Sequence, residues 1–520
     1  MSSVEATPTG ITASIRKTAL NAVHRQMGAK MVEFNGWDMP VEYPAAIGCG
    51  IINEHMAVRT GVGIFDVSHM GDIRLAGPQA LAAVQHISMN DASRLAVGQA
   101  QYSALLYPQG TFVDDVIVHR LAEDEYLLVI NAGTREKDFS WVRDNTRQFD
   151  CIVENLSDDF TQIAIQGPKA VDLLQKLTDA DLSAVKFYWV TRGKLCGLKN
   201  ILLGRTGYTA EDGFEIYIPA DEATSARVWY EILAAGKEFG CVPCGLGARN
   251  TLRLEGALSL YGHEISDTIN VWEARLDRFC KMEKPEFIGR SALEKARVAG
   301  VKRTLVGLEM TERGIARDGY KVLDGGGREI GYVTSGSPAP FLKKNIALAY
   351  VPVELAAVGT ALKVEIRGQG VGAVVVPTPF YKRSKKQGVE NAPEKGSKVT
   401  AAQVLRSYTR DHLPDFGHVP ITDVNQVGSN GDRPIHVACI RGNLDDVVAL
   451  VEGGADVNAT GDLGYTPLHH AASGSLYEIA KVLVSHGADV TAKNEFGETP
   501  IDLCRDRTIE ILQSAKNVRS

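Results

Sequence analysis

The sequence predicts an α+β protein that continues into a small all-β barrel or sandwich and ends in a module of internal repeats. Three observations predict this class. Up to about residue 300, segments with strand periodicity alternate with amphipathic helical segments. From residue 303 to residue 381, short apolar runs are broken by glycine, which is typical of a small β domain. Beyond residue 400, a spacing of 33 residues recurs, which indicates stacked repeats.

In chain order, the first part opens with a helix and a turn-rich stretch. Residues 16–27 have the apolar spacing of a short amphipathic helix, and glycine and proline punctuate residues 28–44. Residues 54–77 are expected to run from a helix end into one alternating strand. The rest of the α+β part is expected to contain a helix at 78–88, strands at 100–107, 112–120 and 125–131, a helix capped by Thr134, and further strand and helix patterns at 162–177, 201–219, 225–240 and 244–258.

Composition and charge exclude several classes of function. The length suggests roughly three or four domains. A net charge of −7 and a pI near 6.0 give no basic surface for nucleic acid or for an anionic membrane. No apolar run is long enough to span a bilayer. The first residues have neither the apolar core of a secretory signal nor the composition of an organellar peptide, so no targeting segment is expected.

The cysteines favour a reducing cytoplasm. The eight cysteines are scattered and have no disulfide-scaffold spacing. Cys241 and Cys244 form a CxxC motif, but no second cysteine pair or histidine pair completes a zinc site, so no metal is expected. Pro243 and Gly245 predict a loop at this motif, and the pair is interpreted as structural.

Residues 110–119 place two adjacent carboxylates, Asp114 and Asp115, inside a short apolar run. Side chains alternate across a strand, so Asp115 is expected on one face with Val113, and Asp114 on the other face. Both faces are otherwise apolar, and a carboxylate there must be paired, hydrogen-bonded or protonated. One of the two acids is therefore a candidate for chemistry. The alternative is a turn or a salt-bridge pair at a strand end.

Two later segments supply further polar groups. Glu215 returns on a strand after a glycine-rich turn, and Arg249 opens a helix after two glycines. With Asp115, they could line one pocket that suits a flat polar heterocycle with a polar tail, because carboxylates match ring N–H donors and arginine matches a carboxylate. Aromatic residues that could sandwich such a ring are Tyr102, Tyr208 and Tyr381. The alternative is that Glu215 and Arg249 form a structural ion pair.

The end of the chain resembles the ankyrin repeat. Gly431, Gly464 and Gly497 lie 33 residues apart, residues 466–472 read TPLHHAA, and residues 454–458 read GADVN. Two complete repeats flanked by partial or capping ones are expected. Such a stack presents a surface for protein contact, although the sequence does not identify the partner.

The first part of the chain closely resembles aminomethyltransferase, the T-protein family of the glycine cleavage system, in order from about residue 17 to residue 381. The motifs that carry the resemblance are FDVSHMGDI, YSALLYPQGTFVDDVIVH, INAGTREKDFSWV, IAIQGPKA, GRTGYTAEDGFEI, PCGLGARNTLRLEGALSLYGHE, FIGRSAL and GYVTSGSPAPFLKKNIALAYV. The resemblance implies a three-domain cloverleaf around a central tetrahydrofolate pocket, with a β-barrel-like third domain and then the all-α ankyrin module. It implies no metal.

The resemblance also implies a reaction. The methylene of an aminomethylated lipoyl group on H-protein passes to tetrahydrofolate as co-substrate, giving 5,10-methylenetetrahydrofolate, ammonia and dihydrolipoyl H-protein. The second acid of the DD pair, Asp115, takes the catalytic role in this family. The residues implied to bind folate are Glu215, Arg249, Asn131, Tyr102, Tyr208 and Tyr381.

Two departures from the family pattern accompany these matches. Ala210 stands where the motif TGYTGE has glycine, and Asn250 stands where an aspartate is common, which removes a charge beside Arg249. Two alternative functions remain: another folate-dependent one-carbon transferase or demethylase of the same fold, or a non-catalytic scaffold with an ankyrin interaction surface.

The expected domain organisation has four parts. Residues 1–300 form a folate-binding core of two α+β subdomains, and residues 301–381 form the barrel-like domain. Residues 382–400 are charged and nearly free of large apolar side chains, so they are interpreted as a flexible linker. Residues 401–520 form the ankyrin module.

Overall fold

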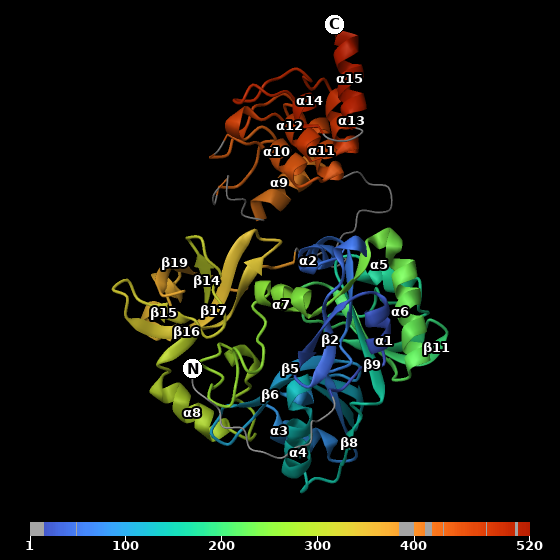
Figure 1. Ribbon diagram of the computed structural model, residues 1–520, viewed down its shortest axis with the longest axis vertical. Helices are drawn as coiled ribbons and strands as arrows, with labels where there is room; N and C mark the ends of the chain where they lie inside the picture. The colour runs from blue at the N-terminus through green and yellow to red at the C-terminus, as the bar shows by residue number, and fades with distance from the viewer. Residues whose placement is uncertain are drawn as a thin grey trace. The chain divides into compact units, whose positions relative to one another are not determined.

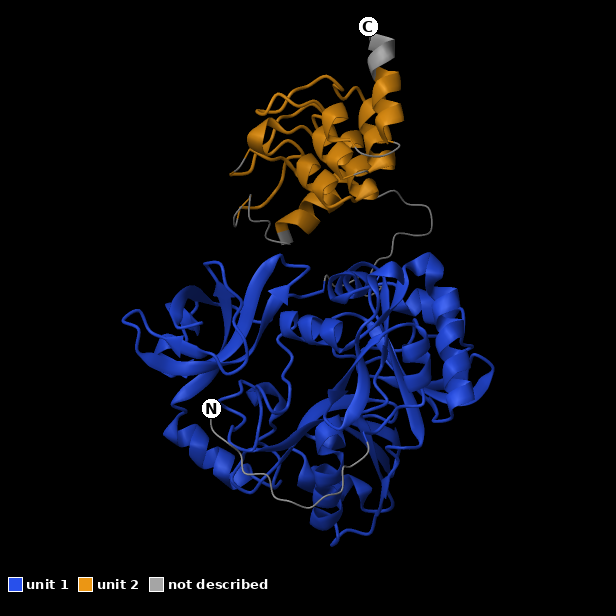
Figure 2. Cartoon of the chain, in the orientation of Figure 1, with its two compact units in different colours: residues 1–384 blue, residues 385–520 orange. Residues whose placement is uncertain are grey.

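A computed structural model describes residues 15–47, 49–383, 400–410, 416, 419–429, 431–474, 476–504 and 508–519. The chain divides into two compact units, residues 1–384 and residues 385–520 (Figure 2). Most of the linker expected at residues 382–400 lies outside the described residues, and the boundary expected near residue 300 stays a prediction. Across the described residues, no helix combines the length and the apolar character needed to cross a membrane.

The acid pair lies in a five-stranded antiparallel sheet with the order β5-β6-β7-β4-β8. Helices α3 and α4 pack against this sheet, and their apolar residues join one buried cluster with those of the strands. The elements are β4 (Gly71–Ala76), α3 (Ala80–Ile87), β5 (Ala100–Leu106), β6 (Phe112–Ala122), β7 (Glu125–Ile130), α4 (Arg135–Asn145) and β8 (Ile152–Asn155).

A β-bulge corrects the expected faces of β6. The register between β5 and β6 pairs Leu105 with Asp114 but Leu106 with Phe112, so Val113 is the extra residue. Val113 therefore packs in the same apolar cluster as Val116 and Val118, rather than on the face of Asp115. The expected alternation holds only after the bulge.

The second sheet has six strands in the order β10-β11-β12-β9-β3-β13. Its neighbours are antiparallel except for β13, which pairs in parallel with β3 at the sheet edge. Figure 1 shows α5 and α6 together at the outer side of this sheet. The elements are α1 (Asn21–Gln26), α2 (Ile51–Thr60), β3 (Val62–Asp66), β9 (Phe160–Gln166), α5 (Ala170–Gln175), β10 (Val190–Leu195), β11 (Leu198–Gly204), β12 (Gly213–Pro219), α6 (Glu222–Gly236), β13 (Cys241–Cys244) and α7 (Leu246–Glu255).

Three expectations for this part were wrong. The CxxC motif is strand β13 and not a loop, because an edge strand tolerates the missing N–H of Pro243. Residues 54–77 contain two strands, β3 and β4, which belong to different sheets. The turn-rich stretch forms a hairpin of β1 (Lys30–Phe34) and β2 (Trp37–Glu42). Its turn residues Asn35 and Gly36 both have positive φ (51° and 82°), as a two-residue hairpin turn requires.

The third part of the first unit is a closed barrel, which decides between the expected barrel and sandwich. Helix α8 (Arg290–Ala299) precedes it. Valine, leucine and alanine side chains from its strands fill the interior. The strands, in order around the barrel, are β14 (Arg303–Met310), β17 (Lys344–Pro352), β16 (Glu329–Ala339), β15 (Lys321–Leu323), β18 (Ala361–Ile366) and β19 (Gln369–Val376).

The second unit is a stack of helix pairs that follows the 33-residue spacing. Asn425 accepts a hydrogen bond from the backbone N–H of Asp456, and Asn458 accepts the equivalent bond from Asp489 (2.8 and 2.7 Å), so one repeat is tied to the next. A proline begins each of α10, α12 and α14, where its missing N–H costs nothing. The helices are α9 (Ala401–Arg410), α10 (Pro434–Ile440), α11 (Leu444–Glu452), α12 (Pro467–Ser473), α13 (Tyr477–Ser485), α14 (Pro500–Leu503) and α15 (Thr508–Arg519).

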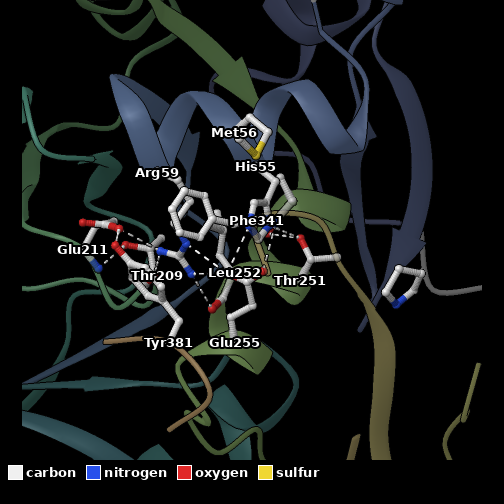
Figure 3. Close-up of polar contacts among 12 residues, drawn as sticks. His55, Met56, Arg59, Thr209, Glu211, Thr251, Leu252, Glu255, Phe341 and Tyr381 are labelled. Atoms are coloured by element: carbon white, nitrogen blue, oxygen red, sulfur yellow. Dashed lines mark hydrogen bonds and ion pairs between the residues drawn. The ribbon is translucent and has the colours of Figure 1, made fainter. Parts of the chain in front are cut away.

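A buried cation joins distant segments of the first unit (Figure 3). Arg59, on α2, forms ion pairs with Glu255 at the end of α7 (2.9 Å) and with Glu211 in the turn before β12 (3.1 Å). Its guanidinium lies 3.8 Å from the ring centre of Tyr381, whose hydroxyl donates to Glu211 (2.5 Å). His55 lies 3.2 Å from Glu255. The side chains of Arg59 and Glu255 are fully buried, so each of these charges is tolerated only because the opposite charge lies beside it.

We expect Arg59→Met to lower the free energy of unfolding of the first unit by about 3–5 kcal/mol, because it leaves two buried carboxylates without their cation. Urea unfolding followed by tryptophan fluorescence measures this, since all five tryptophans lie in the first unit. The matched control is Arg74→Met, which removes the partly exposed pairs with Glu125 and Glu154 and should cost at most about 1 kcal/mol. Equal effects of the two substitutions would contradict the role of Arg59.

Candidate active site

A central cavity of about 200 Å³ lies between the two sheets and the start of α7. The five-stranded sheet contributes side chains from β5, β6 and β7, and the six-stranded sheet contributes side chains from β9 and β12. Most of the rest of the wall comes from the segment after β3, the turn before β12, the start of α7 and the segments that follow α7. The polar and aromatic lining residues are Tyr102, Asp115, Asn131, Gln162, Tyr188, Thr206, Tyr208, Glu215, Arg249, Ser259, Arg278 and Phe279.

Asp115 enters this cavity from β6 and is held at both carboxylate oxygens. Oδ2 accepts a hydrogen bond from the Tyr102 hydroxyl (3.0 Å), and Oδ1 accepts one from Asn131 Nδ2 (2.8 Å). Burial, followed by the negative charge of Asp114, raises the pKa of Asp115 to about 7. The acid is therefore fixed in orientation and able to exchange a proton near neutral pH.

Arg249 lies in the first turn of α7, where the positive end of the helix dipole disfavours a cation. A Cβ atom at Gly245, just before α7, would lie 2.4 Å from the backbone of Val41, so only glycine allows the helix to begin here. The guanidinium of Arg249 lies 4.7 Å from the ring centre of Tyr208 and within 3.9 Å of Met70 Sδ. Burial lowers its pKa. No carboxylate among the described residues forms an ion pair with it, so the site has an unneutralised cation that suits an anionic ligand.

Glu215 faces the same cavity from β12. The Thr206 hydroxyl donates to its Oε2 (2.5 Å), and burial raises its pKa. Within the described part of the chain, no ion pair of 4.0 Å or less joins Glu215 to Arg249, so the structural ion pair considered above is not formed. The two opposite charges line one cavity without contact, which leaves both available to a ligand.

Aromatic rings form part of the cavity wall. The rings of Tyr102 and Phe279 lie 4.7 Å apart at an angle of 58°. The Tyr208 hydroxyl donates to the backbone carbonyl of Ser259, which ties the turn before β12 to the loop after α7. Burial raises the pKa of Tyr188 to about 12. These tyrosines are therefore neutral hydrogen-bonding groups at neutral pH.

The structure brings together six of the seven site residues predicted from sequence. Tyr381 is the exception: it is not among the lining residues, and it contacts Arg59 and Glu211 instead (Figure 3). Its backbone N–H also donates to the carbonyl of Glu255 (2.8 Å). Tyr381 therefore contacts the buried ion pairs of Arg59 and the end of α7 rather than the cavity.

The two departures from the family motif also have local explanations. Ala210 has a φ of 60°, a left-handed conformation that glycine adopts more easily. The side-chain oxygen of Asn250 accepts a hydrogen bond from Arg253 Nε (2.9 Å), so this residue is turned toward Arg253. Asn250 does not line the cavity.

Sequence reasoning missed several lining residues, notably Gln162, Tyr188 and Phe279. Gln162 lies in β9, and its Nε2 donates to the buried Asp72 of β4. A polar residue within a buried strand was the available signal for it. Tyr188 lies in a turn and Phe279 ends a 3-10 helix of three residues, which are both too short for a periodicity to mark a lining position. Among the described residues, no group of three His, Cys, Asp or Glu side chains is arranged to hold a metal ion.

The fold and the cavity define a class of protein: an α+β unit with an attached barrel and one polar cavity between its two sheets. Family models agree with this class. The GCVT N-terminal domain matches residues 20–284, and the glycine cleavage T-protein C-terminal barrel domain matches residues 303–382. The chain belongs to the glycine cleavage T-protein family of aminomethyltransferases. A third model, ankyrin repeats (3 copies), matches residues 408–494.

Individual proteins of known family support the same assignment. An aminomethyltransferase of Koribacter versatilis is 73% identical over 376 residues, which are 72% of this chain and 98% of that protein. An aminomethyltransferase of Acidobacterium capsulatum is 67% identical over 380 residues, which are 73% of this chain and 99% of that protein. The crystal structure of the glycine cleavage system aminomethyltransferase T from Bartonella henselae superposes with a TM-score of 0.66 at 34% identity, covering 71% of this chain and 99% of that one.

We expect Asp115→Asn to raise the stability of the first unit at pH 8 by on the order of 1–3 kcal/mol. The pKa of Asp115 is raised in the folded protein, so its ionisation destabilises the fold. This penalty grows from about pH 4 to pH 7 and is then constant. Urea midpoints at pH 5 and pH 8 measure the effect, which should be smaller at pH 5.

Asp212→Asn is the control of opposite sign. Although burial opposes it, hydrogen bonds and an ion pair with Arg205 lower the pKa of Asp212. Its stabilisation is present above the unfolded pKa of about 4 and is lost as the pH falls through the lower folded pKa. Asp212→Asn should therefore destabilise the unit at pH 8. A destabilising Asp115→Asn at pH 8 would contradict the raised pKa.

Proposed function

We propose that the chain transfers the methylene of an aminomethylated lipoyl group on H-protein to tetrahydrofolate. The products are 5,10-methylenetetrahydrofolate, ammonia and dihydrolipoyl H-protein. The observation that carries this proposal is Asp115, which is held by Tyr102 and Asn131 at the wall of the cavity with a pKa near 7. Membership of the aminomethyltransferase family supports it.

The balance of the reaction defines what the site must do. Two bonds form between the methylene carbon and two amines of tetrahydrofolate, and the bonds from that carbon to the amino nitrogen and to the lipoyl sulfur break. One proton from each folate amine ends on ammonia or on the lipoyl thiol. Asp115 as carboxylate accepts one of these protons and, as carboxylic acid, returns it to a leaving group. A pKa near 7 allows both steps at neutral pH.

The other lining residues bind and orient tetrahydrofolate. Glu215 accepts hydrogen bonds from N–H groups on the edge of the ring, and Arg249 pairs with a carboxylate of the tail. Tyr102 and Asn131 fix Asp115, and Tyr208 contacts Arg249. Tyr381 acts indirectly, through Arg59 and Glu211, on the two segments that carry Arg249 and Tyr208.

The proposed reaction also defines the protein partner of the first unit and the compartment in which the chain acts. Lipoylated H-protein is the partner of the first unit. The ankyrin module binds a second protein through its stacked repeats. All eight cysteines are free thiols, which supports a reducing cytoplasm as the site of the reaction.

We expect Asp115→Asn and Asp115→Ala to lower kcat by about 10²–10⁴-fold, because each removes the group that moves the proton. The measurement is ammonia release that depends on both aminomethylated H-protein and tetrahydrofolate. Asp124→Asn, an exposed acid in the turn after the same strand, is the matched control and should retain full activity. Full activity of Asp115→Ala, or formation of formaldehyde in place of ammonia, would exclude this mechanism.

We expect a chain that ends at residue 383 to bind tetrahydrofolate and transfer the methylene as the full chain does. The central cavity and the Arg59 network lie within residues 1–383, and the curated relatives match without the repeats. The kcat and KM of the two proteins are compared in the ammonia assay. A loss of transfer in the shorter chain would assign the repeats to the enzyme mechanism.

A further inference from the structure

Asp114 is a fully buried carboxylate that the reaction, as described above, does not use. It precedes Asp115 on β6 and does not line the cavity. Its oxygens accept three hydrogen bonds: from the backbone N–H of Asn131 (3.0 Å), from Asn131 Nδ2 (2.8 Å) and from the hydroxyl of Thr134 (2.9 Å). Thr134 was expected to cap α4 with this hydroxyl, but it bonds to Asp114 instead. The carboxylate of Asp114 is therefore held at both oxygens by the segment that precedes α4.

The amide of Asn131 bridges the two acids. Its Nδ2 donates 2.8 Å bonds both to Asp114 Oδ1 and to Asp115 Oδ1. An amide nitrogen has two hydrogens, and both are used here. The reversed amide would place its oxygen against two carboxylate oxygens, so the orientation is fixed by charge. The side-chain oxygen of Asn131 receives no hydrogen bond from any described residue, and Asn131 lines the cavity.

We propose that Asp114 is a positioning residue for the transfer reaction: it sets the Asn131 amide so that the nitrogen holds Asp115 and the oxygen accepts a hydrogen bond from the substrate. This inference rests on the function proposed above. The oxygen of Asn131 would take an N–H group of the folate ring, next to the acid that moves the proton. Asp114 thereby determines the orientation of the Asp115 carboxylate. It also determines that the cavity offers the substrate a hydrogen-bond acceptor, the Asn131 oxygen, rather than a donor.

A purely structural role is the competing explanation, since Asp114 also fastens the turn before α4. The two roles differ in whether the charge of Asp114 acts on Asp115, so the charged groups around these two acids have to be identified. Tyr102, Tyr188 and Tyr208 face Asp115. Asp138 and Lys137 on α4 face Asp114, and Tyr261 is bound to Lys137. Burial and the charge of Asp114 raise the pKa of Asp138 to about 10, so Asp138 is neutral at pH 7. Asp114 is therefore the anion that acts on Asp115.

The substitution Asp114→Asn has two separable effects. It removes a negative charge beside Asp115, which should move the pH at which Asp115 ionises to lower values. The new amide oxygen is expected at the position of Oδ2, which accepts two hydrogen bonds, so the new amide nitrogen faces Asn131 Nδ2. Because that nitrogen cannot accept, the Asn131 amide is free to reverse and present N–H groups to the cavity. A substrate N–H would then meet a donor rather than an acceptor, which weakens binding as well as catalysis.

The experiment compares full-length wild type, Asp114→Asn and Asp138→Asn. Asp138 is an equally buried neighbour that is neutral at pH 7. It is hydrogen-bonded to Asp114 but, among the described residues, not to Asn131, so its substitution disturbs Asp114 without removing the bridge between the two acids. For Asp114→Asn we expect kcat/KM for tetrahydrofolate to fall at least 30-fold, and the acid limb of its pH profile to shift below that of wild type. Asp138→Asn should keep the wild-type limb. Tetrahydrofolate binding by calorimetry should weaken only in Asp114→Asn.

Two results would overturn the proposal: wild-type kcat/KM in Asp114→Asn, or equal losses in both variants with unmoved acid limbs. If Asp114→Asn does not fold, Thr134→Val decides, because it removes one of the three bonds and keeps the charge. A positioning role predicts a several-fold lower kcat with an unmoved acid limb, and a structural role predicts only a lower Tm. A wild type without transfer, or a fully active Asp115→Ala, would refute the proposed function itself.

Discussion

The ionic contacts of Arg59 are the interaction on which the shape of the site depends. A guanidinium with no exposure to water is tolerated only when carboxylates and carbonyls surround it, and here they come from segments about 150 and 200 residues away in sequence. One of these segments continues into the turn that bears Tyr208, and another is the helix that begins near Arg249. The position of the cation-bearing helix and that of the aromatic turn are thus decided together. Tyr381 closes the same cluster from the segment that follows the barrel.

Several features of the cavity are unfavourable to the fold when considered alone. Asp115 has a raised pKa, Arg249 places a cation at the positive end of a helix, and Glu215 is half-buried beside a hydroxyl rather than a base. Each would be removed by a sequence optimised only for stability. All three residues line one cavity, which fits the ligand site proposed above.

Most helices and strands and most of the cavity residues could be predicted from the sequence, because hydrophobic periodicity and motif spacing indicate local structure. Six of the cavity residues were identified through motifs. The errors have physical causes. The turn at Asn35 and Gly36 was interpreted as punctuation, although Asn-Gly between apolar residues indicates a hairpin. Pro243 indicated a loop because the edge position of its strand is a tertiary property. Tyr381 was assigned to the cavity because sequence proximity to a motif does not reveal which side of α7 a returning segment contacts.

The bulge at Val113 has a consequence for how the hairpin of β5 and β6 can change. The sequence offers two chemically identical neighbours, and nothing in their identity decides which one meets the ligand. The extra residue decides it, because it sets the phase of the alternation that follows. Loss or gain of one residue between Leu106 and Asp114 would exchange the two acids between wall and interior. We therefore expect this hairpin to keep its function after many side-chain substitutions but to lose it after the insertion or deletion of one residue. The length of the hairpin is thus required for function.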